Sequence, residues 1–259
     1  MRKRIIILCA IVCLLGISGF VINQMQKEKN GEIYKEIQGQ NGVGNDEVDI
    51  QKVIANPIDF ASLKAINNDI YAWIDIEDTN IHYPIVQSKT DDSYYLEHTI
   101  EGVRGLPGSI YTEKVNAKDF SDFNTLIYGH DMKDGSMFKH LHKFKDSEFF
   151  NTHDTVVIYT EKEMHTYQIY AVVIYDDRHI MYHYDNDDME DREAFIQSLK
   201  EVGERGSLYR KDVTIDTDSK LITMSTCITG QSNKRLLVVA VEMDVKQMTE
   251  FSNTIGHQN

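Results

Sequence analysis

The stretch LITMSTC, residues 221–227, ends an apolar run on a cysteine that has no obvious partner in the chain. Of the three cysteines, the other two, Cys9 and Cys13, lie in an apolar N-terminal segment. Cys227 is therefore the single cysteine of the remaining chain, which excludes a framework of internal disulfides. Three alternatives remain for it: a buried inert thiol, a bridge to another molecule, or a nucleophile.

A cysteine nucleophile reacts as its thiolate, which needs a neighbouring base or cation. Ten histidines and several arginines are available, and spacing alone does not choose among them, because such groups converge in space rather than in sequence. Local context favours two of them. His130 ends the apolar segment TLIYGH, and Arg235 begins the apolar segment RLLVVAVEM after a short turn. Residues at the ends of neighbouring strands can meet in one groove, so Cys227, His130 and Arg235 form the candidate set.

The elements that must position this set are mostly short strands. Many segments are rich in β-branched and aromatic residues and are separated by polar turns, a pattern that favours a mixed or antiparallel barrel. The predicted strands are 71–76, 82–87, 108–113, 125–130, 154–160, 165–175, 212–217, 221–227 and 235–243.

Helices are expected at three places beside these strands. In residues 59–67, Phe60, Leu63 and Ile66 recur at helical spacing behind a capping Asp59. A short helix is predicted at 135–144. A longer helix at 187–206 lies between late strands, with Phe195, Leu199 and Val202 on one face.

The N-terminus predicts a membrane anchor. Three basic residues precede an uncharged apolar run at 5–22, which is near the shortest length that spans a bilayer. A cleaved signal peptide is the alternative. The basic residues would stay in the cytoplasm and place the rest of the chain outside the cell. The expected organisation is a cytoplasmic tail at 1–4, the anchor at 5–22, an extracellular stalk at 23–49, a catalytic domain at 50–250 and a tail at 251–259.

The net charge of −14 argues against binding to nucleic acid. Two polar segments contain side chains of the types that bind metal ions. His140 and His142 are two residues apart on a predicted helix, so they should point away from one another. The acidic run at 185–191 lacks the glycine and the spaced glutamate of a calcium-binding loop, and suits a solvated helix N-terminus. We expect no metal and no cofactor.

Three separate motifs, in order along the chain, resemble the sortase family. The segment TMSTC, residues 223–227, resembles the sortase signature Thr-Leu-x-Thr-Cys, and YGH, residues 128–130, matches the segment of the sortase catalytic histidine. Arg235 lies where sortases keep an essential arginine. The blocks 67–88, 91–102 and 124–144 are similar to class B sortases, and the resemblance extends from about residue 55 to residue 245.

The resemblance implies a closed β-barrel of about eight strands and a cysteine transpeptidase. Cys227 would attack the threonine carbonyl of an Asn-Pro-x-Thr sorting signal, His130 would exchange the protons, and Arg235 would bind the substrate or the oxyanion. Tyr128, Ser225 and Thr226 would line the substrate groove, whereas Leu96 is expected to be structural. The implied partners are surface proteins with a C-terminal sorting signal and an amine of peptidoglycan or of its lipid-linked precursor.

Alternative functions share parts of this site. A pilin-polymerising sortase would use the same residues, a thiol peptidase would hydrolyse the same acyl-enzyme, and an inactive binding domain would keep only the fold. One departure from the class B pattern concerns the groove directly. Class B enzymes often carry an acidic residue two positions after the cysteine, where this chain has Thr229.

Overall fold

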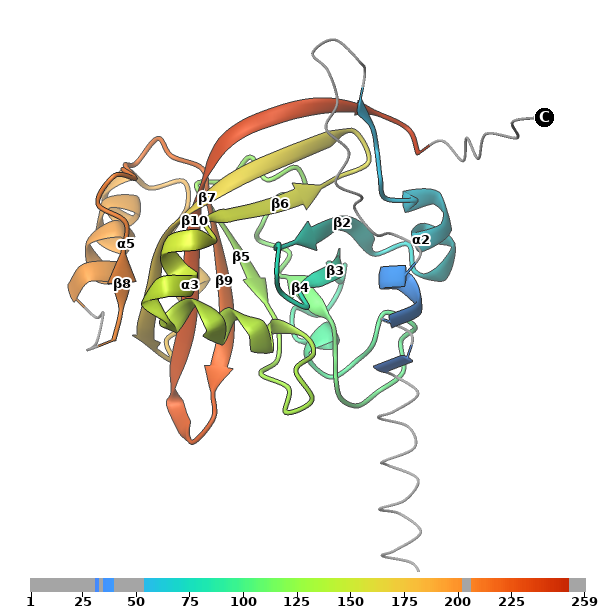
Figure 1. The fold of residues 1–259 in the computed structure, drawn as a ribbon, viewed down its shortest axis with the longest axis horizontal. Coiled ribbons are helices and arrows are strands. Elements are labelled where there is room, and N and C mark those ends of the chain that lie inside the picture. The colour runs from blue at the N-terminus through green and yellow to red at the C-terminus, as the bar shows by residue number, and fades with distance from the viewer. Residues whose placement is uncertain (1–30, 33–34, 40–53, 202–205, 252–259) are drawn as a thin grey trace, which may run out of the picture.

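The structure, a computed structural model, describes residues 31–32, 35–39, 54–201 and 206–251. These residues form a mainly β domain with helices at its periphery (Figure 1). The elements in chain order are β1 (Ile54–Ala55), α2 (Phe60–Ile66), β2 (Ile70–Asp75), β3 (His82–Val86), η1 (Tyr94–Leu96), β4 (Ile110–Thr112), β5 (Asn124–Tyr128), η2 (Phe138–Lys145), α3 (Ser147–Thr152), β6 (Thr155–Tyr159), β7 (Glu163–Asp176), α4 (Ile180–His183), α5 (Met189–Glu201), β8 (Leu208–Tyr209), β9 (Leu221–Ile228) and β10 (Gln231–Thr249).

Eight of the strands close into a barrel, as the sequence predicted. They pair in the order β10-β9-β5-β4-β3-β2-β6-β7, and an additional pairing of β7 with β10 closes the ring. Most neighbours are antiparallel, but β5 runs parallel to β9, and β3 runs parallel to β4. The parallel pair β5–β9 brings the C-terminal ends of two strands to the same rim of the barrel.

The apolar run of β10 contacts two separate cores because both of its faces are covered. Leu236, Val238 and Ala240 belong to the core inside the barrel. Leu237 and Val239 alternate with them and pack on the outer face with Phe195 and other residues of α5. This double coverage explains why the strand is continuously hydrophobic rather than alternating.

The predicted helices are found with shifted boundaries. Helix α2 has its Asp59 cap, whose Oδ1 accepts a hydrogen bond from the Ser62 amide at 3.0 Å, but Ile66 is exposed rather than packed. The segment predicted at 135–144 is the 3₁₀ helix η2. Phe195 and Leu199 of α5 are fully buried, and Val202 lies outside the described residues.

Two other expectations differ from the structure or lie beyond it. Residues 212–217 were predicted as a strand, which is wrong, because this segment is irregular. Residues 35–39, within the predicted stalk, are helical, and Ile37 packs into the barrel core at 3% exposure. The predicted anchor at 5–22 lies outside the described residues. No helix within the described ranges is long and apolar enough to cross a membrane.

Candidate active site

A groove of about 840 Å³ opens at the rim where β5 and β9 end. Its lining includes Cys227, His130 and Arg235, which the sequence predicted to meet. Three neighbouring strands supply them. In the β9–β10 pair, Cys227 lies directly opposite Arg235. In the β5–β9 pair, Tyr128 lies opposite Ser225, so His130 and Cys227 each follow that pair by two residues.

Gly129, directly before His130, passes through a tightly packed place between β4 and η2. A Cβ atom on Gly129 would lie 2.5 Å from Ile110 Cδ1 and 2.7 Å from the Phe138 ring, so only glycine fits between these side chains. The Gly129 amide donates to the Ser225 carbonyl at 3.2 Å, and the Thr226 hydroxyl donates to the Gly129 carbonyl at 2.8 Å. These two bonds extend the β5–β9 pairing as far as the histidine.

The other predicted groove residues lie at the expected rim. Tyr128, Ser225 and Thr226 all line the groove. Thr226 is only 2% exposed, and its hydroxyl is already bound to the Gly129 carbonyl, so its contribution to the groove is mainly to hold the two strands together.

A backbone carbonyl orients the His130 ring. His130 Nε2 lies 2.7 Å from the Leu96 carbonyl oxygen, and because a carbonyl only accepts, Nε2 carries the hydrogen. Nδ1 is therefore the ring nitrogen left to exchange protons. Leu96 was expected to be structural, but it lines the groove and has this additional contact.

Arg235 is also held by backbone carbonyls. Its guanidinium donates to the Ser232 carbonyl at 3.0 Å and to the Lys234 carbonyl at 2.9 Å. Within the described part of the chain, no carboxylate forms an ion pair with it. Its charge and its remaining N–H groups are thus available to a ligand beside Cys227, and a guanidinium does not lose its proton. Cys227 itself is exposed to the groove.

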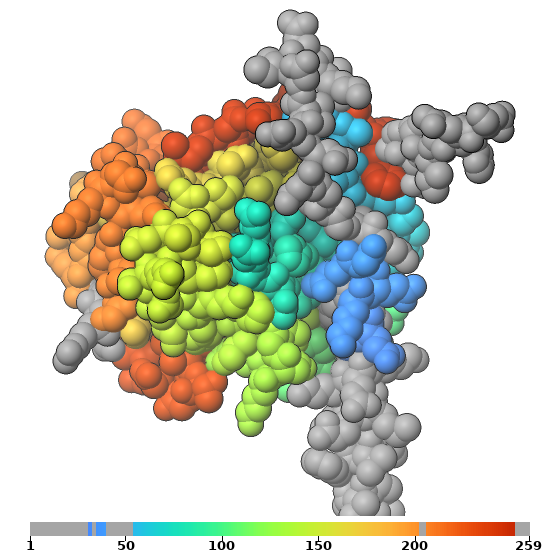
Figure 2. Space-filling model, in the orientation of Figure 1, coloured from blue at the N-terminus to red at the C-terminus, as the bar shows by residue number. Residues whose placement is uncertain are grey.

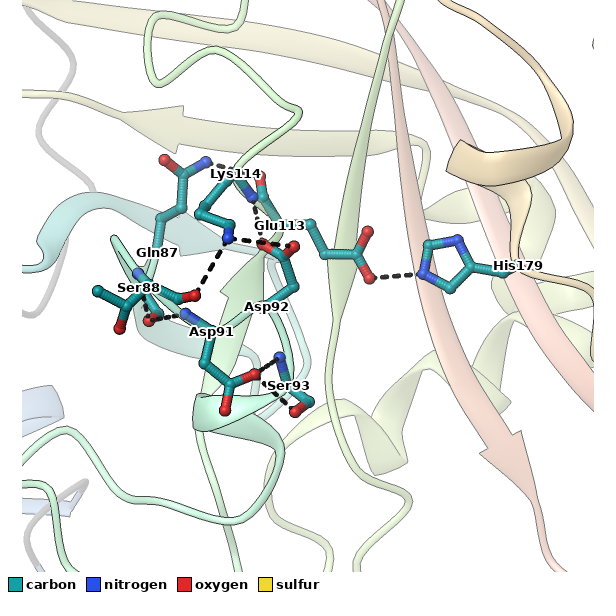
Figure 3. Close-up of polar contacts among 9 residues, drawn as sticks. Gln87, Ser88, Asp91, Asp92, Ser93, Glu113, Lys114 and His179 are labelled. Atoms are coloured by element: carbon teal, nitrogen blue, oxygen red, sulfur yellow. Dashed lines mark hydrogen bonds and ion pairs between the residues drawn. The ribbon is translucent and has the colours of Figure 1, made fainter.

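Another part of the groove lining, the paired set, is built differently, from paired charges (Figure 3). His179 Nε2 lies 2.7 Å from Glu113 Oε1, and Lys114 Nζ lies 3.7 Å from Asp92 Oδ2. Arg178 donates to both carboxylate oxygens of Asp176, at 2.8 and 2.6 Å.

Burial raises the pKa of the Glu113 carboxyl above the ordinary glutamate value, although the nearby His179 opposes this shift. Aromatic rings surround the carboxyl group. The Tyr128 ring stacks on Tyr111 at a centroid distance of 5.2 Å, and the His179 ring stacks on Tyr182 at 4.0 Å. Burial, followed by the charge of Glu113, raises the pKa of Tyr128, so this hydroxyl stays protonated at neutral pH.

The sequence does not predict the residues of the paired set or the role of Leu96. They come from the segment that ends in η1, the residues directly after β4, and the end of β7 with the residues that follow it. No motif connects them, because only the closure of the barrel brings these segments to one groove. His140 and His142 do point to different partners, the Asn80 amide and the Cys227 carbonyl. In the described residues no group of three or more His, Cys, Asp or Glu side chains is placed to hold a metal ion.

The chain belongs to the sortase family, whose members are cysteine transpeptidases. The Sortase domain matches residues 74–243. Within that family it belongs to class B. It is 36% identical to Sortase B of Listeria monocytogenes over 67% of this chain and 68% of that protein.

Solved structures agree with this class. The crystal structure of Bacillus anthracis sortase B in complex with AAEK1 superposes with a TM-score of 0.69 at 30% identity, covering 85% of this chain and 99% of that one. A Streptococcus pyogenes class B sortase involved in pilus biogenesis gives a TM-score of 0.61 at 29% identity, covering 71% of this chain and 97% of that one.

Proposed function

We propose that this class B sortase cleaves an Asn-Pro-x-Thr sorting signal after the threonine and transfers the new carboxyl end to a cell-wall amine. The observation that carries the proposal is the groove in which Cys227, His130 and Arg235 meet. A nucleophile, a proton carrier and a cation that no carboxylate of the described residues pairs with are the parts that acyl transfer requires, and they lie in one groove.

In the first half-reaction, the Cys227 thiolate attacks the threonine carbonyl carbon. Arg235 stabilises the oxyanion that forms. When the intermediate collapses, the C–N bond after threonine breaks, and His130 Nδ1 gives its proton to the departing amine. A thioester on Cys227 remains, and the Leu96 carbonyl holds the His130 ring in the tautomer that this transfer needs.

In the second half-reaction, an acceptor amine attacks the thioester carbon and its proton passes to His130 Nδ1. The C–S bond then breaks, an amide forms, and Cys227 returns to the thiolate. The acceptor amine belongs to peptidoglycan or its lipid-linked precursor, and the donors are surface proteins with a C-terminal sorting signal. An N-terminal anchor at 5–22 would place the domain outside the cell, attached to its membrane.

A pilin-polymerising activity is the second candidate. It is favoured by one observation, the similarity to a Streptococcus pyogenes class B sortase that is involved in pilus biogenesis. In that case the acceptor would be a lysine amine of a second pilin subunit, and the acyl-enzyme would be the same.

The test uses quenched fluorescent peptides of the Asn-Pro-x-Thr and Leu-Pro-x-Thr types, with and without an amine acceptor. We expect cleavage of the Asn-Pro-x-Thr peptide after threonine and a ligated product when amine is present, both read by mass. Peptide hydrolysis that amine never diverts would identify a thiol peptidase. Preference for the Leu-Pro-x-Thr peptide would overturn the proposed signal, and a folded protein that cleaves neither peptide would contradict the proposal.

A further inference from the structure

A buried carboxylate, that of Asp131, lies directly after His130. Its side chain is 4% exposed, which is unusual for an aspartate. Oδ2 accepts a hydrogen bond from the Thr229 hydroxyl at 2.7 Å, and Oδ1 accepts one from Lys139 Nζ at 2.8 Å. Burial alone would raise the pKa of Asp131, but these two donors outweigh it and lower the pKa, so the group is an anion at neutral pH.

The partners of Asp131 belong to the segments that carry the reacting groups. Thr229 lies two residues after Cys227, in the turn between β9 and β10, and Lys139 lies on η2. Figure 2 shows the η2 surface next to the β9–β10 hairpin. The carboxylate thus joins the loop that follows His130 to the end of the strand that carries Cys227.

His142 makes a second connection in the same cluster. Its Nε2 lies 3.0 Å from the Cys227 carbonyl oxygen and 3.7 Å from Asp131 Oδ2. The carbonyl only accepts, so Nε2 carries the hydrogen and donates it. Burial lowers the pKa of His142, so the ring is neutral at neutral pH and acts as a hydrogen-bond donor rather than as a charge.

We propose that Asp131 is a positioning residue that fixes the spacing of His130 and Cys227 through Thr229 and His142. This inference rests on the proposed function. Asp131 touches neither substrate nor reacting atoms; it acts by holding the backbone on both sides of the reacting pair. Its carboxylate stands on the histidine side of the site, and Thr229, on the cysteine side, supplies the matching hydroxyl.

An ordinary stabilising contact would give a different result from a positioning contact. Loss of a buried hydrogen bond lowers stability wherever it occurs. Loss of positioning lowers the rate of the chemical step and leaves substrate binding almost unchanged, because small misplacements of reacting groups are costly. The separation of kcat from KM is therefore the deciding measurement.

The first test is Asp131→Asn, which keeps the shape but offers one acceptor oxygen instead of two. We expect kcat for the Asn-Pro-x-Thr peptide to fall about 10-fold and KM to change less than about 2-fold. Thr229→Val should lower kcat in the same direction by a smaller factor. Asp119→Asn, in the loop before β5, removes a carboxylate bound to the Ser121 hydroxyl and amide, and should change neither constant.

The second test moves the carboxylate across the contact. In the double variant Asp131→Asn/Thr229→Asp, the new amide can donate to the new carboxylate, so the link is restored with its polarity reversed. We expect kcat to recover most of the loss, whereas Thr229→Asp alone places two carboxylates side by side and should lower kcat. A double variant with no more activity than Asp131→Asn would overturn the positioning role.

A third measurement requires no substrate. Hydrogen–deuterium exchange should rise in Asp131→Asn at residues 226–230 and 129–131, with no change in β2 and β3. Unchanged exchange in these segments, or a lower melting temperature with wild-type kcat, would contradict the inference. A wild-type protein that cleaves no peptide would count against the proposed function instead, and the exchange result would still decide the role of Asp131.

Discussion

Two sets of charged side chains that line the groove are held in opposite ways. In the catalytic set, His130 and Arg235 donate to the backbone carbonyls of Leu96, Ser232 and Lys234. In the paired set, Arg178 pairs with Asp176, which lies opposite Lys234 in the β7–β10 pair, and His179 pairs with Glu113.

A backbone carbonyl orients a cation without neutralising it, because it carries only a partial charge. A carboxylate partner orients a cation and also cancels its field. Arg235 therefore keeps a positive charge that no carboxylate of the described residues cancels. The rest of the lining is mostly acidic, because Asp91, Asp92, Glu113, Asp176 and Asp177 outnumber Lys114, Arg178 and His179.

The largest effect in this comparison should come from the nucleophile. Cys227→Ala should abolish cleavage, lowering kcat/KM by about a thousandfold or more, because no other group in the groove can form a thioester. The side chain is exposed, so the free energy of unfolding should change by less than about 0.5 kcal/mol. Peptide assays and thermal melts together check this expectation, and residual cleavage at a substantial rate would identify a different nucleophile.

The next largest effect should separate the two arginines. Arg235→Lys keeps a positive charge but loses the planar set of donors, and should lower kcat/KM by about 100-fold. The matched change in the paired set, Arg178→Lys, breaks the two-point bond to Asp176 and should cost less than about 5-fold, mainly through KM. Equal losses at the two positions would contradict the contrast between the two sets.

A smaller loss of catalytic rate should follow when a side chain is added next to the Leu96 carbonyl that holds His130. Gly108 has a φ of +66°, and a Cβ there would lie 2.6 Å from the Leu96 carbonyl oxygen and 3.1 Å from His130 Cδ2. Gly108→Ala should therefore displace the carbonyl that holds His130 and lower kcat by about 10-fold, besides costing about 1–3 kcal/mol of stability.

The control for that substitution is Gly105→Ala. Gly105 also has a positive φ, of +128°, but no atom lies within 4 Å of its Cβ position. It should lose stability with nearly unchanged kcat. If the two variants lose kcat equally, backbone strain rather than contact with the Leu96 carbonyl and His130 explains the loss.

The smallest effect on catalysis is expected at Glu113, in the paired set. Burial raises the pKa of Glu113, so the folded state prefers the protonated acid. Its stabilising contribution is complete below the ordinary glutamate pKa and is lost as pH rises through the raised folded-state value. The Glu113→Gln variant has no carboxyl group to ionise and so does not lose stability in this way. The melting temperature of the variant relative to the wild type should therefore rise as pH increases above the ordinary glutamate pKa of about 4.5. The kcat should change less than about 3-fold. Melting curves between pH 4 and pH 8 check the sign, and a relative stability that falls with rising pH would contradict it.

The sequence was sufficient to predict the barrel and to predict that Cys227, His130 and Arg235 lie in one groove. Strand periodicity and three ordered motifs carry that information locally. It failed at residues 212–217, where alternating apolar residues suggested a strand. Val213 is instead buried in the outer core, beside α5, without joining the sheet. Burial of one side chain on a loop gives the same local pattern as a short strand.

The contacts that hold the site residues in place could not be predicted from the sequence, for a different reason. The Leu96 carbonyl, the Asp131–Thr229 bond and the Glu113–His179 pair join residues 34, 98 and 66 positions apart. Such contacts depend on the final register of the barrel and not on any local pattern. A backbone carbonyl also leaves no signature in the residue type, so the role of Leu96 could not be predicted from its side chain.

The central claim is that Cys227 forms an acyl-enzyme with the sorting signal. The most direct measurement is the intact mass of the protein after incubation with an Asn-Pro-x-Thr peptide without amine, followed by addition of an amine. We predict a mass increase equal to the peptide fragment ending in threonine, located on Cys227, removed by hydroxylamine and transferred to the amine. A protein whose Cys227 reacts with iodoacetamide but never carries this fragment, while the peptide is still cleaved, would contradict the claim.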